Sequence, residues 1–328
     1  MFITGVDDPW FNLATEDWIF RDMDPECRIL FLWRNSDTVV IGRYQNPWVE
    51  CRVDNMETDG VRLARRQSGG GAVFQDLGNT CFTFLSGRKT YSKEQNFGII
   101  TRALSRFGID ARMSGRNDIL VDGKKVSGSA FKMTADRAFH HGTLLIDTDL
   151  GRLSGYLNPD KKKLEAKGIT SVKSRVANLT EFRADLDHDA LSGAIIDEFF
   201  TEYGASCPVE ELTYETLKNI PHLADYYEQM RDWDWRFGKT PDFTHHLESR
   251  FDWGQLDMHL DVHRGVVEDV KIYSDCLVPD FIEALHRVLP GARYTRDSLL
   301  EALSRAAGNG GTEAAMASDI AGWLDGEL

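Results

Sequence analysis

The first two thirds of the chain alternate between strand-like and helix-like stretches, and no other feature limits the fold class as strongly. Short runs rich in β-branched and aromatic residues predict strands at residues 29–33, 38–41, 61–64, 72–74, 119–121 and 143–146. Apolar residues at helical spacing predict helices over residues 12–23, 93–107 and 191–200. We place Asn12 at the N-cap of the first helix and Gly108 at the end of the second. The alternation predicts a domain that mixes helices and strands.

A change of pattern near residue 240 predicts a domain boundary. Residues 231–246 lose their periodicity and contain Gly238 and Pro241, which is typical of a linker. Two strand candidates and a helix candidate follow, before a glycine-rich turn, at residues 256–262, 266–273, 279–289 and 308–311. A chain of 328 residues, at about 150 residues per domain, has room for two domains. We therefore predict a large domain at 1–240 and a small α+β domain at 241–328.

Charge and composition exclude several classes of protein. The chain has 38 basic and 52 acidic residues and a formal charge of −14, whereas nucleic-acid binding needs a basic surface. The longest apolar run, Ile29–Trp33, is far shorter than the roughly 18 residues that span a membrane. Five cysteines without CxxC spacing argue against a disulfide framework and a zinc ribbon. The amino terminus lacks a basic leader followed by an apolar core, so we expect a cytoplasmic protein.

A glycine loop at Arg65–Phe74 is the first candidate for a ligand site. Its sequence is RRQSGGGAVF, in which three consecutive glycines expose backbone N–H groups and two arginines supply positive charge. The loop matches neither GxxxxGK[ST] nor GxGxxG, so it is not a nucleotide motif of those types. For this segment alone, a flexible hairpin turn is the favoured alternative.

Three further segments carry basic or histidine side chains. Lys124 and Lys125 stand among small residues, where they indicate either an anion-binding site or an exposed basic turn. His140 and His141 are neighbours on a predicted strand, so they point to opposite faces and make a poor metal chelate. Residues 161–175 hold six basic residues against one glutamate, which favours a solvated face or a surface for an anionic ligand or acidic partner.

Taken in order, these motifs closely resemble those of the lipoate–protein ligases. The resemblance begins at DPWFNLA (residues 8–14), continues through GNT at 78–80, SGRND, KKVSGSA and HHGTLL, and runs to Glu181. It extends more loosely over the C-terminal domain. It implies an α+β fold in which mixed and antiparallel sheets are flanked by helices, the catalytic fold of biotin and lipoate ligases, with a small α+β C-terminal domain.

The resemblance also implies an activity. Members of this family use ATP and Mg²⁺ to convert lipoic acid to lipoyl-AMP, with release of pyrophosphate. They then form an amide between the lipoyl group and one lysine of an apo lipoyl domain. The expected partners are the lipoyl domains of 2-oxoacid dehydrogenase complexes and the H protein of glycine cleavage, with no nucleic acid and no membrane.

Motif positions assign roles to individual residues by resemblance. Lys125 is the expected catalytic residue, in contact with both the lipoyl carbonyl and the phosphate. The ATP and adenylate contacts are expected at Arg66, Gly71, Ala72, Val73, Phe74, Asn79, Asp118 and Lys125. The lipoate contacts are expected at Ser68, Gly69, Gly70, Gly71, Lys125, Ser127, Gly128 and His141. Mg²⁺ is expected on the nucleotide phosphates, with Asp118 as a candidate ligand, and residues 161–180 match the adenylate-binding loop. The sequence departs from the family at Gln75, where relatives commonly carry histidine.

Three alternatives remain open at this point. The first is an octanoyl or lipoyl transferase that works without ATP. Transferases that form a thioester intermediate need a nucleophilic cysteine, but no cysteine lies between Cys81 and Cys207. Cys81 itself lies in a strand-like stretch, which favours a small buried side chain. A biotin–protein ligase typically has a GRGRxGR-type loop, which the sequence lacks. A non-catalytic homologue that only binds the carrier is the third alternative.

Overall fold

The computed structural model describes residues 1–115, 117–157, 176–204, 206–237, 245–308 and 311–327. These residues form two compact units. Unit 1 comprises Met1–Ile41, Pro47–Arg66 and Ala72–Arg236, and unit 2 comprises Gly42–Asn46, Gln67–Gly71 and Phe237–Leu328. Two short segments of the N-terminal region therefore cluster with the C-terminal residues. No helix in the described part of the chain is long and apolar enough to cross a membrane.

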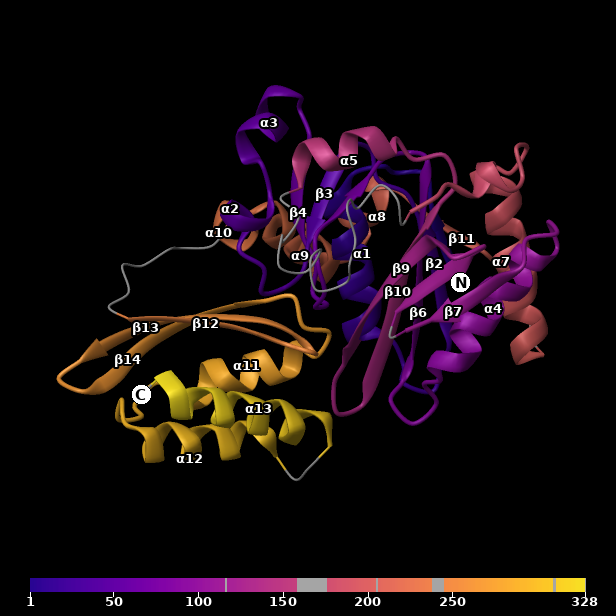
Figure 1. The fold of residues 1–328 in the computed structure, drawn as a ribbon. Coiled ribbons are helices and arrows are strands. Elements are labelled where there is room, and N and C mark those ends of the chain that lie inside the picture. The colour runs from indigo at the N-terminus through magenta and orange to yellow at the C-terminus, as the bar shows by residue number, and fades with distance from the viewer. Residues whose placement is uncertain (116, 158–175, 205, 238–244, 309–310, 328) are drawn as a thin grey trace. The chain divides into compact units, whose positions relative to one another are not determined.

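An eight-stranded mixed sheet is the centre of unit 1 (Figure 1). Its strands follow the order β11-β1-β2-β6-β10-β9-β8-β7. Strand β1 is parallel to both of its neighbours, whereas the pairs from β2 to β7 are antiparallel. The strands are β1 (Phe2–Thr4), β2 (Ile29–Trp33), β6 (Asn79–Gly87), β7 (Ala111–Ser114), β8 (Asp118–Val121), β9 (Lys124–Met133), β10 (Arg137–Leu145) and β11 (Glu210–Leu212). The expected α+β fold with mixed sheets is confirmed.

Helices cover both faces of this sheet, because its central strands are apolar on both faces. Side chains of a strand alternate between the faces, and in β2 Leu30 and Leu32 belong to one core while Phe31 and Trp33 belong to another. Helices α4 (Lys93–Ser105) and α7 (His188–Tyr203) close the first core, and α1 (Pro9–Asp22) and α9 (Pro221–Arg231) close the second. The shorter helices are α2 (Pro47–Glu50), α3 (Val53–Thr58), α5 (Leu150–Tyr156), α8 (Tyr214–Asn219), α10 (Trp233–Arg236) and the 3₁₀ turn η2 (Leu179–Glu181).

A second, three-stranded sheet in unit 1 carries both ends of the glycine loop. Its order is β4 (Arg62–Arg65), β3 (Thr38–Ile41) and β5 (Val73–Gln75). Strand β3 lies in the middle, parallel to β4 and antiparallel to β5. The glycine loop leaves β4 and enters β5, which do not pair with each other. The alternative of a hairpin turn for this loop is therefore wrong.

Unit 2 contains an antiparallel meander with three helices on one face (Figure 1). Its strands are β12 (His245–Phe251), β13 (Gly254–His263) and β14 (Val266–Ser274). Alternate residues Leu256, Met258 and Leu260 are buried against α11 (Pro279–Val288), α12 (Arg296–Ala307) and α13 (Thr312–Glu327), so the predicted alternation is confirmed. Gly238 and Pro241 of the predicted linker lie outside the described residues.

The predicted cap of the first helix is wrong. Helix α1 begins at Pro9, and Asp8 is its N-cap, with Oδ1 accepting a hydrogen bond from the Trp10 N–H at 2.9 Å. Proline suits the first helical position because its φ angle is already helical and its missing N–H is not needed there. Asn12 is fully buried, and its Nδ2 donates to the carbonyls of Val6 and Arg34. The asparagine therefore ties loops to the helix and does not cap it.

The adjacent histidines of β10 point to opposite faces, as strand alternation predicts. His140 is fully buried among the rings of Phe82, Phe84, Phe97 and Phe131, at centroid distances of 4.7–6.0 Å. Neither of its ring nitrogens has a hydrogen-bond partner among the described residues. Burial, followed by the charges of His141 and Lys93, holds the pKa of His140 well below its usual value. His140 is therefore neutral in the folded chain.

We expect this histidine to make the fold sensitive to acid. Because the folded pKa lies below the unfolded value of about 6.5, the unfolded chain binds the extra proton and stability falls as pH drops below that value. The expected slope is about 1.4 kcal/mol per pH unit in the window between the two pKa values. Urea unfolding between about pH 5 and 8 measures this slope. His140→Leu should reduce this slope, and His263, the exposed last residue of β13, provides the control His263→Gln. An unchanged slope in His140→Leu contradicts the assignment.

Candidate functional site

An ion pair between Lys125 and Asp118 marks one end of the large sheet. Lys125 Nζ lies 2.7 Å from Asp118 Oδ1, and the two side chains are 29% and 20% exposed. Both residues lie near the ends of neighbouring antiparallel strands, Asp118 at the start of β8 and Lys125 near the start of β9. The pair is partly buried and partly accessible to solvent. It is therefore a suitable place to bind an anion.

The turn before Lys125 follows directly from the sequence. Asp122 and Gly123 both have positive φ angles, 49° and 78°, which a two-residue hairpin turn of type I′ requires. The lysines lie in the strand after this turn, so the alternative of a basic turn is wrong. Lys124 Nζ pairs with Glu181 Oε2 at 2.9 Å, so each ammonium has its own carboxylate.

A bulge and a glycine together set the direction of the Lys125 side chain. The β8–β9 register moves from Ile119–Ser127 to Leu120–Lys125, which inserts one extra residue into β9. Such a bulge changes the face on which the next side chains lie. A Cβ on Gly128 would lie 2.9 Å from Lys125 Nζ. The glycine therefore leaves the space that the lysine side chain occupies.

A series of buried polar side chains connects α1 to β10 in the core of unit 1 that α1 and α9 close. The Glu16 carboxylate is only 1% exposed. Its Oε1 accepts from Thr83 Oγ1 at 2.7 Å and lies 2.8 Å from His141 Nδ1. Thr83 Oγ1 in turn accepts from Trp33 Nε1 at 3.1 Å. This series fixes the ring of His141, an expected lipoate contact.

Our sequence analysis missed Glu16, although a signal was present. Glu16 lies three residues after Leu13 and four residues before Phe20, so helical periodicity places it on the buried face of α1. Burying a carboxylate is costly unless hydrogen bonds compensate. A glutamate at an apolar helical position therefore indicates a buried polar site.

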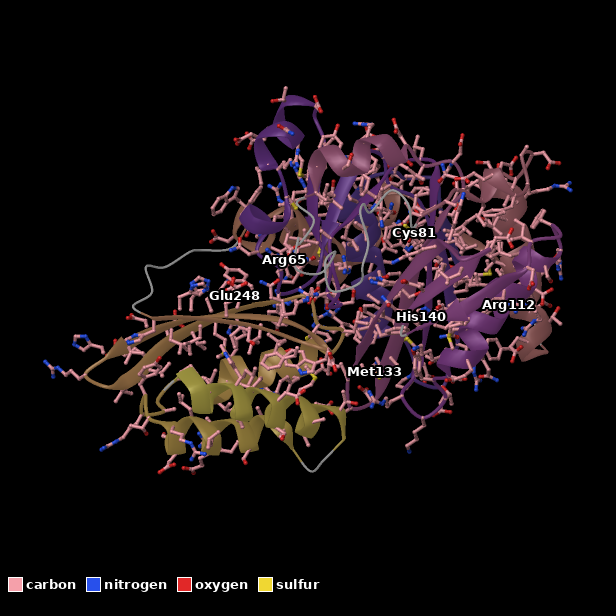
Figure 2. The ribbon with its side chains drawn as sticks, in the orientation of Figure 1. Arg65, Cys81, Arg112, Met133, His140 and Glu248 are labelled. Carbon is pink, nitrogen blue, oxygen red and sulfur yellow. The ribbon has the colours of Figure 1, made fainter. Side chains whose placement is uncertain are left out.

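Strand alternation gives the two arginines of the loop different roles. Arg66 is 5% exposed, and its Nη1 donates to the Val40 carbonyl at 3.1 Å. Burial lowers its pKa to about 10, while the Glu16 carboxylate favours its charged form, so Arg66 is a cation at neutral pH. Arg65 points elsewhere, with Nε donating to the Trp235 carbonyl at 2.8 Å and Nη2 to the Arg236 carbonyl at 2.7 Å. Arg65 (labelled in Figure 2) holds α10 in place, and Arg66 is the arginine that we expect to bind an anionic ligand.

The glycine loop itself is firmly held within unit 2. The Gly70 N–H donates to the Cys276 carbonyl at 2.9 Å, and the Arg43 N–H donates to the Ser68 carbonyl at 2.8 Å. A Cβ on Gly69 would lie 2.0 Å from the Cys276 carbonyl oxygen. Glycine is therefore required at 69 for a close approach of two backbones. The Gly70 amide, expected to be available to a ligand, is bonded to protein in this conformation.

The remaining expected contacts differ in their exposure. Ala72 and Val73 are partly exposed. Phe74 is buried, with its ring 5.5 Å from that of Tyr156. Asn79 is fully buried, and its Nδ2 donates to Cys81 Sγ at 3.2 Å. The basic segment 161–175 lies outside the described residues.

Two further positions bear on the sequence analysis. Ser127 is fully buried, and its hydroxyl has no hydrogen-bond partner within the part of the chain that is described. At the departure from the family, Gln75 is buried and its Oε1 accepts from Asn35 Nδ2 at 2.7 Å. The Gln75 side chain therefore links the three-stranded sheet to the loop after β2.

Cys81 is a small buried side chain of β6, as expected (Figure 2). It is 1% exposed, and burial, reinforced by the Glu16 charge, raises the pKa of its thiol. A protonated and inaccessible thiol is a poor nucleophile. Unit 1 therefore presents charged groups in Lys125, Asp118 and Arg66, and not an activated thiol at Cys81.

An α+β fold with Lys125, Asp118 and Arg66 in one unit has the charged groups that suit an enzyme acting on anionic ligands. Comparison with protein families identifies it further. Residues 8–200 match the lipoyl protein ligase A/B catalytic domain, and residues 240–324 match the bacterial lipoate protein ligase C-terminus. The chain belongs to the lipoate–protein ligase family, and the expectation of a ligase is confirmed.

Individual relatives support the family over nearly the whole chain. Lipoate-protein ligase A of Psychrobacter cryohalolentis is 55% identical and covers 99% of this chain and 97% of its own. P. falciparum LipL1, solved in complex with lipoate, is 33% identical, with a TM-score of 0.86 over 99% of this chain and 98% of its own.

Two other solved structures match a smaller part of this chain. A lipoate-protein ligase A bound with ATP is 26% identical, with a TM-score of 0.62 over 73% of this chain and 96% of its own. The bi-partite lipoate protein ligase of Thermoplasma acidophilum, described with its E2 lipoyl domain, is 26% identical, with a TM-score of 0.63 over 74% of this chain and 98% of its own.

We expect Gly69→Ala to destabilise the chain far more than Gly71→Ala. A Cβ at 69 collides with a backbone oxygen, whereas a Cβ at 71 meets no atom within 4 Å. Strain of this kind typically costs about 1–3 kcal/mol. Thermal melting of the two variants measures the difference, and equal melting temperatures contradict the close approach.

Proposed function

We propose that the chain is an ATP-dependent lipoate–protein ligase that forms lipoyl-AMP and then lipoylates a lysine of apo lipoyl domains. Its relatives carry the ligase name or were solved with lipoate, with ATP or with a lipoyl domain described beside them. The acceptors in this proposal are the lipoyl domains of 2-oxoacid dehydrogenase complexes and the glycine cleavage H protein, in the cytoplasm. The observation that carries the proposal is the Lys125–Asp118 pair, at the position that the family motif assigns to the catalytic lysine.

The first half-reaction requires no general base. A carboxylic acid is already ionised at neutral pH, because its pKa is about 4–5. Its oxygen attacks the α-phosphorus of ATP, and the bond to pyrophosphate breaks. The main barrier is repulsion between the carboxylate and the triphosphate, which fixed positive charges reduce. Lys125 and the buried Arg66 supply such charges.

The Lys125–Asp118 pair keeps the lysine in place before ligands arrive. Asp118 neutralises Lys125 in the free chain, and an incoming phosphate or carboxylate competes for the same ammonium. The Asp118 carboxylate is also a suitable oxygen donor for Mg²⁺, which binds through one or two carboxylates together with substrate phosphates. Bound Mg²⁺ would neutralise phosphate charge.

The second half-reaction does require a base. The acceptor lysine has a pKa of about 10.4, so its deprotonation at neutral pH costs about 4–5 kcal/mol. The free amine attacks the lipoyl carbonyl, an amide forms, and AMP leaves. In this proposal the Lys125 ammonium stabilises the carbonyl oxygen and Asp118 accepts the proton of the attacking amine.

An assay with lipoate, Mg²⁺-ATP and an apo lipoyl domain separates this function from its alternatives. A ligase releases pyrophosphate and increases the mass of the carrier by one lipoyl group. A transferase that works without ATP modifies the carrier only from a pre-activated acyl donor, and a non-catalytic carrier-binding homologue does neither. Failure to release pyrophosphate from ATP and free lipoate contradicts the proposal.

We expect Lys125→Met to reduce pyrophosphate release by at least about 100-fold, the usual effect of removing one preorganised charge. Lys124→Met is the matched control, because Lys124 is the adjacent residue and pairs with a different carboxylate. The control should retain activity within a few-fold. Normal adenylation by Lys125→Met would falsify the role of Lys125.

We expect Gly128→Ala to reduce the rate without unfolding the chain. The new methyl group would displace the Lys125 ammonium, which is the end of a flexible side chain and can move at little cost. Activity should therefore fall at least tenfold, or about 1.4 kcal/mol, while the melting temperature stays close to that of the parent. Gly155→Ala, where a Cβ meets no atom within 4 Å, is the control. Full activity in Gly128→Ala argues against a fixed position for Lys125.

A further inference from the structure

The face of the unit 2 sheet opposite its helices, here called the outer face, carries a cluster of two histidines and an aspartate. His246 lies on β12, and Asp257 and His259 lie two residues apart on β13. His246 and His259 are directly opposite each other in the antiparallel register. Because Leu256, Met258 and Leu260 of β13 are buried with the helices, Asp257 and His259 face away from them. Glu248, which also lies on β12, marks this outer face in Figure 2.

The three side chains converge on a single point. Asp257 Oδ1 lies 2.8 Å from His246 Nε2 and 2.9 Å from His259 Nε2. The two imidazole rings are stacked, with centroids 4.5 Å apart and an angle of 19° between their planes. One ligand atom from each residue lies within 4.8 Å of the others. The register of the two strands holds this geometry, so little reorganisation is needed for a shared ligand.

We propose that His246, Asp257 and His259 bind a divalent transition-metal ion of the Zn²⁺ class. Zinc takes nitrogen and carboxylate oxygen ligands at about 2.0–2.2 Å in a tetrahedral arrangement. In that arrangement neighbouring ligand atoms are about 3.3 Å apart, so modest side-chain rotations around the present positions suffice. Two imidazoles and one carboxylate favour Zn²⁺, Ni²⁺ or Cu²⁺ over Mg²⁺ and Ca²⁺, which prefer oxygen donors.

The exposure of the cluster leaves a fourth position open. The His246 side chain is 52% exposed, that of His259 27% and that of Asp257 14%. The Asp257 side chain is thus the most buried of the three ligands, and the His246 side chain is the most exposed. Three protein ligands and one water molecule complete a tetrahedral shell.

The charges around the cluster make a sharp test possible. Glu248 is opposite Asp257 in the β12–β13 register, and it adds negative charge at the rim. Lys271 is opposite His259 in the β13–β14 register. Its ammonium repels a divalent cation bound between the two histidines and the aspartate. Removing the charge of Lys271 should therefore strengthen the binding of a cation at this cluster.

The proposed metal ligands and the residues proposed for ligation belong to different units of the chain. Lys125, Asp118 and Arg66 belong to unit 1, whereas all three metal ligands belong to unit 2. Bound metal would link β12 to β13, because the ligands come from both strands. We therefore expect the metal to stabilise the chain without being needed for pyrophosphate release.

Zinc binding to the full chain tests the proposal. The protein is purified without a histidine tag, stripped with a chelator and dialysed against Zn²⁺, and its metal content is measured. We expect one ion per chain, with binding at least tenfold weaker in His246→Ala and in His259→Ala. His263→Ala is the control, because this residue lies at the β13–β14 turn, outside the cluster. No bound zinc, or binding unchanged in both cluster variants, overturns the proposal.

Two further measurements distinguish a metal site from altered folding in the variants. Lys271→Met should bind Zn²⁺ several-fold more tightly, since it removes a like charge while leaving the ligands intact. Co²⁺ in place of Zn²⁺ should give the intense visible absorption of a tetrahedral site. Weaker binding in Lys271→Met, or a cobalt spectrum typical of six-coordinate aqueous ions, overturns the proposal.

Discussion

The burial of both faces of the eight-stranded sheet is the constraint on which unit 1 depends. Strands β6 and β10 lie at its centre, and every residue of β6 is buried. Polar groups on such strands are stable only when they are paired within the protein. Thr83 on β6 meets this condition through Trp33 and Glu16, and Glu16 in turn holds His141. His140 does not meet it, since its neighbours are rings, and its ring is kept neutral.

The proposed chemistry follows from charge placement rather than from a nucleophile. Arg66 is buried and stays cationic, and Lys125 is half-exposed and held by one carboxylate. A buried cation needs no reorganisation when an anion arrives, which makes it effective in a water-poor site. Cys81 lies in the same sheet, but burial keeps its thiol protonated. These properties favour adenylation of an already ionised acid over acyl transfer through a thioester.

Backbone contacts in unit 2 give the glycine loop a definite conformation. Three consecutive glycines would be flexible in isolation, but the Cys276 carbonyl accepts from Gly70 and leaves no room for a side chain at Gly69. In this conformation the loop can offer a ligand only those main-chain groups that are not already bonded within the protein. The β12–β14 sheet is used on both faces, with helices packed on one and the histidine–aspartate cluster on the other.

The sequence alone determined the elements whose signals are local. The alternation over 256–262, the helix near 93–107 and the strand at 29–33 were predictable, because burial imposes a period of two or of about 3.6 on the residues themselves. The order of the motifs indicated the family, and the resemblance gave Lys125 as the expected catalytic residue. The tertiary structure decided what depends on residues far apart in the chain. Only packing shows that Glu16 contacts His141 and that the backbone of Gly69 approaches that of Cys276. Packing also decides that Arg65 and Arg66 bond to different segments, and strand register places His246 opposite His259. No local pattern encodes these contacts, because each is set by the register and packing of segments between 13 and 207 residues apart.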